Sequence, residues 1–282
     1  MFESEVHLFV FRRQLMTLRF AAADRDQVVG GYTYKSAQIE RDAIKQTVER
    51  AKDKLKIRMA YLLTPNEPAE GWPVTQQIGD WWRPYIPSDA IQVECLSWDP
   101  DSVDAPRSEW LGWAVQPVYD DAQLELTCDP NPSAGSMGNQ GFKCQKACTK
   151  VVYSTGIRGC NLDPEDFKIE ATIASKDALK LQAADFIGTP FTLAHGWLSW
   201  TRLDGIVEER PIMAHNNTTG EVTVLWEGVE LEVGAEVVAL PNCPGTWAAC
   251  EARRPDPQNH YGGAIYKPVK DPIAQGVSMS WG

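Results

Sequence analysis

Two pairs of cysteines, Cys148 with Cys160 and Cys243 with Cys250, constrain the fold of this chain more than any other feature. Between the pairs lies a series of short strand-like stretches, which predicts a β-meander. If the meander folds as one compact unit, its start and its end lie close together and the four thiols can converge. Four thiolates suit either a structural zinc ion or an iron–sulfur cluster. A metal at this place would fasten an irregular C-terminal segment that has little core of its own.

The spacing within each pair does not name the metal. Eleven residues separate Cys148 from Cys160, and six separate Cys243 from Cys250. Zinc fingers and ribbons typically place about two to four residues between paired ligands, and the common ferredoxin patterns also differ. On spacing alone, a second interpretation stays open, in which these are buried free cysteines without a metal.

Three further cysteines complete the seven in the chain. Cys95 and Cys128 stand in strand-like stretches, where a cysteine usually serves as a small buried hydrophobe. Cys144 stands four residues before Cys148 and is an alternative ligand in its place. The odd total disfavours a disulfide framework.

Length and charge narrow the class of protein. A chain of 282 residues with 43% hydrophobic and 23% charged residues can form two soluble domains. The net charge of −11 and the lack of a Lys/Arg-rich segment exclude a nucleic-acid surface. The sequence contains no run of about eighteen apolar residues, so we expect neither a membrane span nor a stable membrane association. The acidic N-terminal stretch is unlike a signal peptide, so we expect folding in a cytoplasm with reduced cysteines.

The strand predictions begin near the N-terminus and cover most of the chain. Residues 64–89 interrupt them with five prolines among three tryptophans and predict a long connecting segment. Before the domain boundary the predicted strands are Glu5–Arg12, Leu15–Phe20, Tyr32–Ile39, Ala90–Trp98 and Trp110–Cys128. After it they are Asp166–Ile173, Ala178–Ala183, Phe191–Arg202, Gly205–His215, Glu221–Trp226 and Val229–Leu240.

Residues 39–57 suit either an amphipathic helix or two exposed strands on their periodicity. The turn-rich segment Asp129–Gly141 predicts a domain boundary. The tryptophan-rich loop Trp72–Tyr85 predicts either a subunit contact or an aromatic loop packed on its own domain.

The cysteine motifs resemble the signatures of a known family. The string CTKVVYSTGIRGCNLDPEDF (148–167) and the string CPGTWAACEARRPDPQNHYGG (243–263) are similar, in order and spacing, to two motifs of phage baseplate hub proteins. This family includes relatives of the tail tip protein L of phage lambda and the hub proteins of gene transfer agents. Two departures are the wider first cysteine pair and the AIYKPVKD stretch after Gly263, where the family is rich in aromatic residues.

The resemblance implies a mainly-β protein with two domains. Residues 1–140 would form a tail-hub β-barrel or sandwich, and residues 141–282 a small β-barrel with the cysteine cluster. An iron–sulfur cluster (4Fe–4S) on Cys148, Cys160, Cys243 and Cys250 is preferred over zinc. Asn259, Tyr261 and the pair Gly262–Gly263 would form a turn whose backbone approaches that cluster.

The resemblance also implies a place of action. The protein would be a structural virion protein of a long-tailed phage, assembled in the host cytoplasm and located in the baseplate at the tail tip. It would form a homotrimeric ring that links the distal tail protein and the tape measure protein to the central spike or tail fibre protein.

No motif of an enzyme is recognisable in the sequence. The four histidines, at positions 7, 195, 215 and 260, show no metal-binding spacing. His195 and His215 are predicted to be structural, and His260 to stand beside the cysteine site without being a ligand. We therefore predict a protein without enzymatic activity. The alternatives are a tail-tip enzyme that acts on the cell envelope and a zinc-stabilised binding module unrelated to phages.

Overall fold

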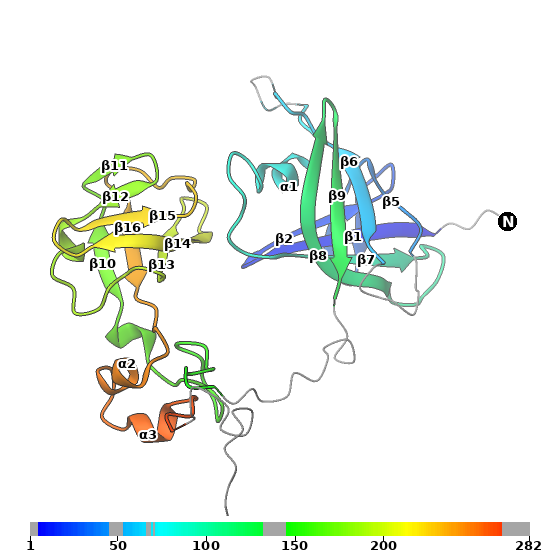
Figure 1. The fold of residues 1–282 in the computed structure, drawn as a ribbon. Helices are drawn as coiled ribbons and strands as arrows, with labels where there is room; N and C mark the ends of the chain where they lie inside the picture. Colours follow the sequence, from blue (N-terminus) through cyan, green and yellow to red (C-terminus); the bar gives the residue numbers. More distant parts are fainter. Residues whose placement is uncertain (1–4, 45–52, 66–68, 70, 132–144, 267–282) are drawn as a thin grey trace, which may run out of the picture. The chain divides into compact units, whose positions relative to one another are not determined.

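The computed structural model describes residues 5–44, 53–65, 69, 71–131 and 145–266. Strands dominate and the helices are short, so the prediction of a mainly-β protein is confirmed (Figure 1). The chain divides into two compact units. The first comprises residues 1–138 together with 202–208, and the second comprises residues 139–201 and 209–282. The boundary predicted at residues 140 and 141 lies outside the described residues.

In its described residues, the first unit forms one sheet of nine strands in the order β3-β4-β2-β1-β7-β8-β9-β6-β5. Most neighbours are antiparallel, and β2 with β4 is a parallel pair. The strands are β1 (Val6–Arg13), β2 (Met16–Ala21), β3 (Gln27–Val29), β4 (Tyr32–Ser36), β5 (Ile39–Arg41), β6 (Leu55–Ala60), β7 (Ile91–Trp98), β8 (Arg107–Asp120) and β9 (Gln123–Pro130).

One kinked segment joins β4, which lies next to one end of this strand order, to β5 at the other end. Only Ala37 and Gln38 separate β4, which pairs with β2, from β5, which pairs with β6. Backbone hydrogen bonds continue across the kink, from the Ala37 N–H to the Ala21 carbonyl and from the Ala60 N–H to the Gln38 carbonyl. The sheet is therefore barrel-like. In the ambiguous stretch 39–57, β5 and the start of β6 are strands, and residues 45–52 lie outside the described residues.

Strand alternation explains the core of the first unit. In β7 every second residue is buried, beginning with Ile91, and its buried side chains pack with those of β1, β6 and β9. The connecting segment after β6 contains one short helix, α1 (Gln76–Asp80), and the cis peptide Arg83–Pro84. Trp81 and Trp82 are buried in this core, so these two tryptophans pack on their own domain.

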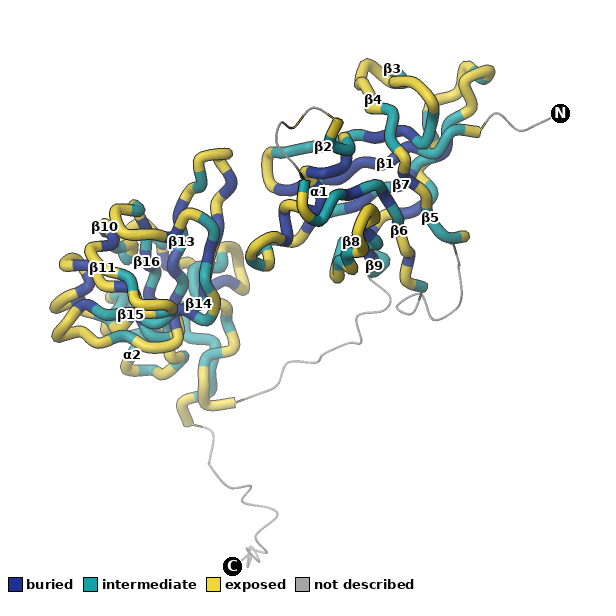
Figure 2. The backbone as a smooth tube through the Cα atoms, turned by 90° about the horizontal axis from the view of Figure 1, so that it is seen from above, coloured by how far each residue is buried: buried dark blue, intermediate teal, exposed yellow. Residues whose placement is uncertain are grey.

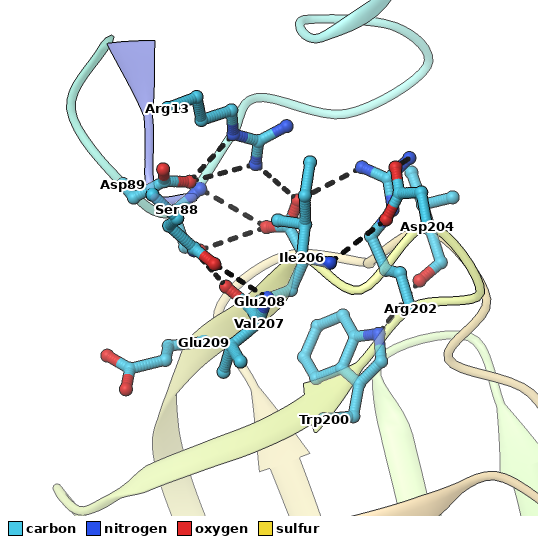
Figure 3. Close-up of polar contacts among 12 residues, drawn as sticks. Arg13, Ser88, Asp89, Trp200, Arg202, Asp204, Ile206, Val207, Glu208 and Glu209 are labelled. Atoms are coloured by element: carbon cyan, nitrogen blue, oxygen red, sulfur yellow. Dashed lines mark hydrogen bonds and ion pairs between the residues drawn. The ribbon is translucent and has the colours of Figure 1, made fainter. Parts of the chain in front are cut away.

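A buried polar network adds to the first unit (Figure 3). Arg13, fully buried, donates from Nη2 to Glu208 Oε1 at 2.7 Å and from Nε to Asp89 Oδ1 at 2.9 Å. Glu208 also accepts from Ser88 Oγ at 3.0 Å and from Arg202 Nη1 at 3.3 Å. Burial lowers the pKa of Arg13, but the hydrogen bonds to the two carboxylates outweigh it, and the net pKa is raised.

The second unit, as far as the structure describes it, forms a sheet of seven strands in the order β10-β16-β13-β14-β15-β12-β11. In this sheet the two edge strands follow each other in the chain, because only Ile173 and Ala174 separate β10 from β11. The Ile173 N–H donates to Ala235 O and the Ala174 N–H to Gln182 O. The strands are β10 (Ile169–Thr172), β11 (Ser175–Asp177), β12 (Lys180–Gln182), β13 (Trp197–Thr201), β14 (Val207–Asn216), β15 (Glu221–Val224) and β16 (Glu236–Leu240).

The core of the second unit is apolar. Phe186, Leu198 and Ile212 are fully buried within it. Figure 2 marks the buried stretches of the backbone in dark blue. His215 is structural, as predicted, because its Nδ1 accepts from the Leu193 N–H at 3.1 Å and its Nε2 lies 2.9 Å from the Phe186 carbonyl. Both ring nitrogens are therefore satisfied by backbone groups.

Candidate metal centre

The four predicted cysteines line a single cavity of about 150 Å³. Cys148 and Cys160 come from the segment before β10, Cys243 follows β16, and Cys250 stands in the short helix α2 (Trp247–Glu251). The antiparallel pairing of β10 with β16 explains the convergence. Ile169, at the start of β10, lies opposite Ala239, near the end of β16. The segments before β10 and after β16 therefore leave the sheet from the same end.

A compact turn sets the place of Cys160. Tyr153 and Asn161 have positive φ angles, of 61° and 55°, so the backbone adopts the left-handed conformation at each end of this loop. The Asn161 N–H donates to Ser154 O at 2.7 Å, and the Cys160 N–H donates to Ser154 Oγ at 3.0 Å. The Asn161 side chain bonds the backbone of Gly156 through both its oxygen and its nitrogen. These local bonds fix the loop without a hydrophobic core.

The second cysteine pair is held by helix capping. Thr246 caps α2, because its side chain accepts from the Ala249 N–H at 3.2 Å. The Cys250 N–H donates to Thr246 O at 3.1 Å, and the Cys243 N–H donates to Asn242 Oδ1 at 2.8 Å. Both cysteines are thus placed by the first turn of one short helix and the residues just before it.

Hydrogen bonds join the two segments directly. The Cys148 N–H donates to Gly245 O at 2.8 Å, and the Tyr153 hydroxyl donates to Pro241 O at 2.7 Å. Tyr261 O–H lies within hydrogen-bond distance of Lys146 O, at 2.6 Å, and of Gly245 O, at 3.1 Å. The thiols are therefore brought together by protein contacts alone.

The Gly262–Gly263 turn lies beside Cys148. The Gly262 N–H donates to Cys148 Sγ at 3.2 Å. A Cβ at Gly262 would come within 2.8 Å of Lys150 Cγ, and a Cβ at Gly263 would come within 2.3 Å of Lys146 O. The backbone approaches so closely that no side chain fits without a shift, which explains the two glycines.

Two consecutive arginines follow Cys250, and the second of them connects the two cysteine segments. Arg253 donates to Asn242 O at 3.0 Å, and its guanidinium lies 4.2 Å from the ring centroid of Phe191. Arg254 donates to Cys160 O at 2.6 Å. The family motif contains an arginine at position 253, whereas the role of Arg254 was not predicted from the sequence. In the sequence, Arg254 stands out only as a second cation directly after Arg253.

The thiols influence one another electrostatically. Burial raises the pKa of Cys250, and Cys160, Cys148 and Cys243 raise it further, while Arg254 lowers it. Burial likewise raises the pKa of Tyr153 to about 12. The Cys250 thiol is thus within electrostatic reach of the other three cysteines.

Among the described residues, no group of three or more His, Cys, Asp or Glu side chains is arranged to hold one metal ion. A single zinc ion would require every sulfur within about 2.3 Å of it. A cavity of about 150 Å³, in contrast, accepts a guest as large as benzene. The structure thus shows four thiols around a space that is large for one ion, and a backbone N–H directed at one sulfur.

Among the other cysteines and His260, His260 is the one described residue that lines this cavity. Cys95 and Cys128 are buried in the first unit, as predicted. Cys144, the alternative to Cys148 as a metal ligand, lies outside the described residues. His260 lines the cavity, and its Nε2 lies 3.3 Å from Asp256 Oδ2.

The fold has a solved counterpart. It is similar to a chain in the virion of the native gene transfer agent (GTA) particle, with a TM-score of 0.71. The likeness covers 99% of this chain and 93% of that chain at 14% sequence identity, so it establishes the fold alone. No family model matches the sequence. No helix among the described residues is long and apolar enough to cross a membrane.

One sequence relative is much more similar but longer. An uncharacterised protein of Xylella fastidiosa (strain 9a5c) is 47% identical over 174 residues. The match covers 62% of this chain and 36% of that protein, so it spans little more than a third of the relative's length.

Proposed function

We propose that this protein is a structural component of a virion of the long-tailed phage type, without enzymatic activity. The observation that carries the proposal is the likeness of nearly the whole fold to a chain of the gene transfer agent virion. The finer role that we propose is the baseplate hub at the distal tail end. There a homotrimeric ring would link the distal tail protein and the tape measure protein to the central spike or tail fibre.

We further propose that Cys148, Cys160, Cys243 and Cys250 hold an iron–sulfur cluster of the 4Fe–4S type. When bound, the cluster would supply iron–thiolate bonds that cross-link the two cysteine pairs. The cavity that all four cysteines line supports this assignment. The Gly262 N–H would stabilise the charge on Cys148 Sγ, and the glycine pair leaves room for that approach.

The role of the cluster in this proposal is structural. The segments that carry the cysteines have hardly any apolar core, so a cross-link there stabilises them directly. Among the described residues, the cavity contains no carboxylate, and its one histidine is paired with Asp256. Within the part of the chain that the structure describes, His260 makes its ion-pair contact with Asp256 and no hydrogen bond to a cysteine thiol, so it does not form the pair that activates a thiol nucleophile.

Anaerobic purification tests the cluster. We expect a coloured protein with iron and acid-labile sulfide in equal amounts. A colourless protein with one zinc ion, or with no metal, contradicts the cluster.

Deletion of the gene from a particle-producing strain tests the virion role. We expect particles without a complete distal tail end, restored by a plasmid copy, and a trimer of the purified protein by native mass spectrometry. Complete, infective particles from the deletion strain would refute the structural role. Hydrolysis of peptidoglycan by the purified protein, lost on Cys160→Ser, would favour the tail-tip enzyme instead.

A further inference from the structure

Arg254 connects the two cysteine segments at a point that no sequence motif indicates. Its Nη1 donates to the Cys160 carbonyl at 2.6 Å, and its Nη2 lies 3.4 Å from the Asn161 carbonyl. Arg254 itself follows Cys250 by four residues. One guanidinium therefore joins the loop of one cysteine pair to the segment that carries the other.

The geometry is specific to arginine. The planar fork of the guanidinium binds two neighbouring carbonyls at once, which a lysine ammonium cannot do in the same way. Asp256 Oδ1 lies 3.3 Å from Arg254 Nε and orients the group from behind. The side chain of Arg254 is only 13% exposed, so water competes little for these bonds.

The Cys160 loop needs such an anchor. Its own hydrogen bonds, from Cys160 and Asn161 to Ser154, fix its shape but not its place beside α2. At the start of the loop, the Tyr153 hydroxyl donates to the Pro241 carbonyl. At its end, Arg254 contacts the carbonyls of Cys160 and Asn161.

We propose that Arg254 is a positioning residue that holds Cys160 in register with Cys250, so that the cavity can take up a metal cluster. The proposal rests on the cluster assignment above, but the placement of Cys160 is a property of the protein itself. If a cluster is bound by these cysteines, the Arg254 guanidinium would add a positive charge to its surroundings, which would favour the reduced state.

The test compares Arg254→Gln, Arg254→Lys and a charge-matched control, Arg107→Gln. Arg107 is 80% exposed in the first unit, 3.5 Å from Glu109. Outer residues that orient metal ligands typically change metal retention by about ten- to a hundredfold. We expect both Arg254 variants to lose iron to a chelator faster by about that factor, and the control to match the wild type. The midpoint potential of the remaining cluster should fall in Arg254→Gln and stay near the wild-type value in Arg254→Lys.

A second measurement does not depend on iron. In metal-free protein, the rate at which iodoacetamide labels each cysteine is followed by mass spectrometry. We expect faster labelling of Cys160 in both Arg254 variants and unchanged labelling of Cys243. Unchanged iron loss together with unchanged Cys160 labelling would overturn the proposal. If the wild type binds no iron, the cluster assignment fails, and the labelling still decides the positioning role. If Arg254→Gln does not fold, Asp256→Asn replaces it, with a smaller change expected in the same direction.

Discussion

The sheets and the cysteine-bearing segments of this protein are stabilised by different interactions. In the core of the second unit, side chains such as Phe186, Leu198 and Ile212 are completely buried. In the described residues 145–166 and 241–266, Leu162 is the one buried residue other than glycine and proline. Val151 and Ile157 there are exposed. The hydrophobic effect maintains the sheets, whereas hydrogen bonds and the proposed cluster maintain the segments.

The largest expected effect separates the two groups of cysteines. Cys243→Ser should abolish binding of iron and sulfide, because it removes one of the four cysteines lining the cavity. Cys128→Ala is the control, since Cys128 lies in the core of the first unit and should leave the iron content unchanged. Iron and sulfide assays on anaerobically purified protein measure both. Full iron in Cys243→Ser would remove that residue from the ligand set.

Truncation of a core side chain tests the sheet. Phe186→Ala should lower the free energy of unfolding by about 3–5 kcal/mol, because it leaves a cavity in a fully buried cluster. The matched change in the segments is Ile157→Ala, which should cost less than about 0.5 kcal/mol, since Ile157 is fully exposed. Urea unfolding followed by circular dichroism gives both values. Equal losses would contradict the contrast between sheet and segments.

The buried ion pair of the first unit should come next. Arg13→Met removes the cation between Glu208 and Asp89 and should cost about 3 kcal/mol, near the lower end for broken buried pairs, because Arg202 still reaches Glu208. Lys35→Met breaks an exposed pair with Asp26 and should cost about 1 kcal/mol or less. Thermal and urea unfolding compare the two variants. A loss at Arg13 no larger than that at Lys35 would show that the network adds no stability.

The glycine pair at the cysteine site should give a smaller effect. Gly263→Ala places a methyl group against the Lys146 carbonyl and should cost about 1–3 kcal/mol. Gly262→Ala meets mainly the flexible stem of Lys150, so its loss should be smaller. Thermal unfolding of the two variants, measured side by side, checks the order, and the reverse order would count against the backbone approach seen here.

The smallest effect concerns pH. Burial raises the pKa of Cys95 to about 12. Because the folded pKa lies above the unfolded one, its contribution to stability is complete below the unfolded pKa and is lost as pH rises toward 12. At pH 9 the native protein should therefore label slowly at Cys95 and readily at the four cavity cysteines of metal-free protein. Fast labelling of native Cys95 would be inconsistent with the burial of this thiol.

Much of this arrangement could be predicted from the sequence because it depends on local patterns. The alternation in β7 is of this kind, and so is the convergence of the cysteine pairs, which needed only an antiparallel meander between them. Helix α1 was missed because the prolines around it predict a loop. Arg13 and Glu208 are 195 residues apart, and no local pattern indicates their contact. Arg254 was missed because the spacing of ligands says nothing about what orients them.

The short edge strands β10 and β11 would limit how this protein joins the neighbouring subunits proposed for it. Each edge strand of the second unit is short, four residues in β10 and three in β11. Short edges are poor templates for strand addition by another chain, and natural sheets use them to avoid uncontrolled pairing. A subunit that adds to this unit therefore has to recognise side chains on a face or a loop. Specific assembly at this surface would then be decided by side-chain chemistry and not by generic backbone pairing.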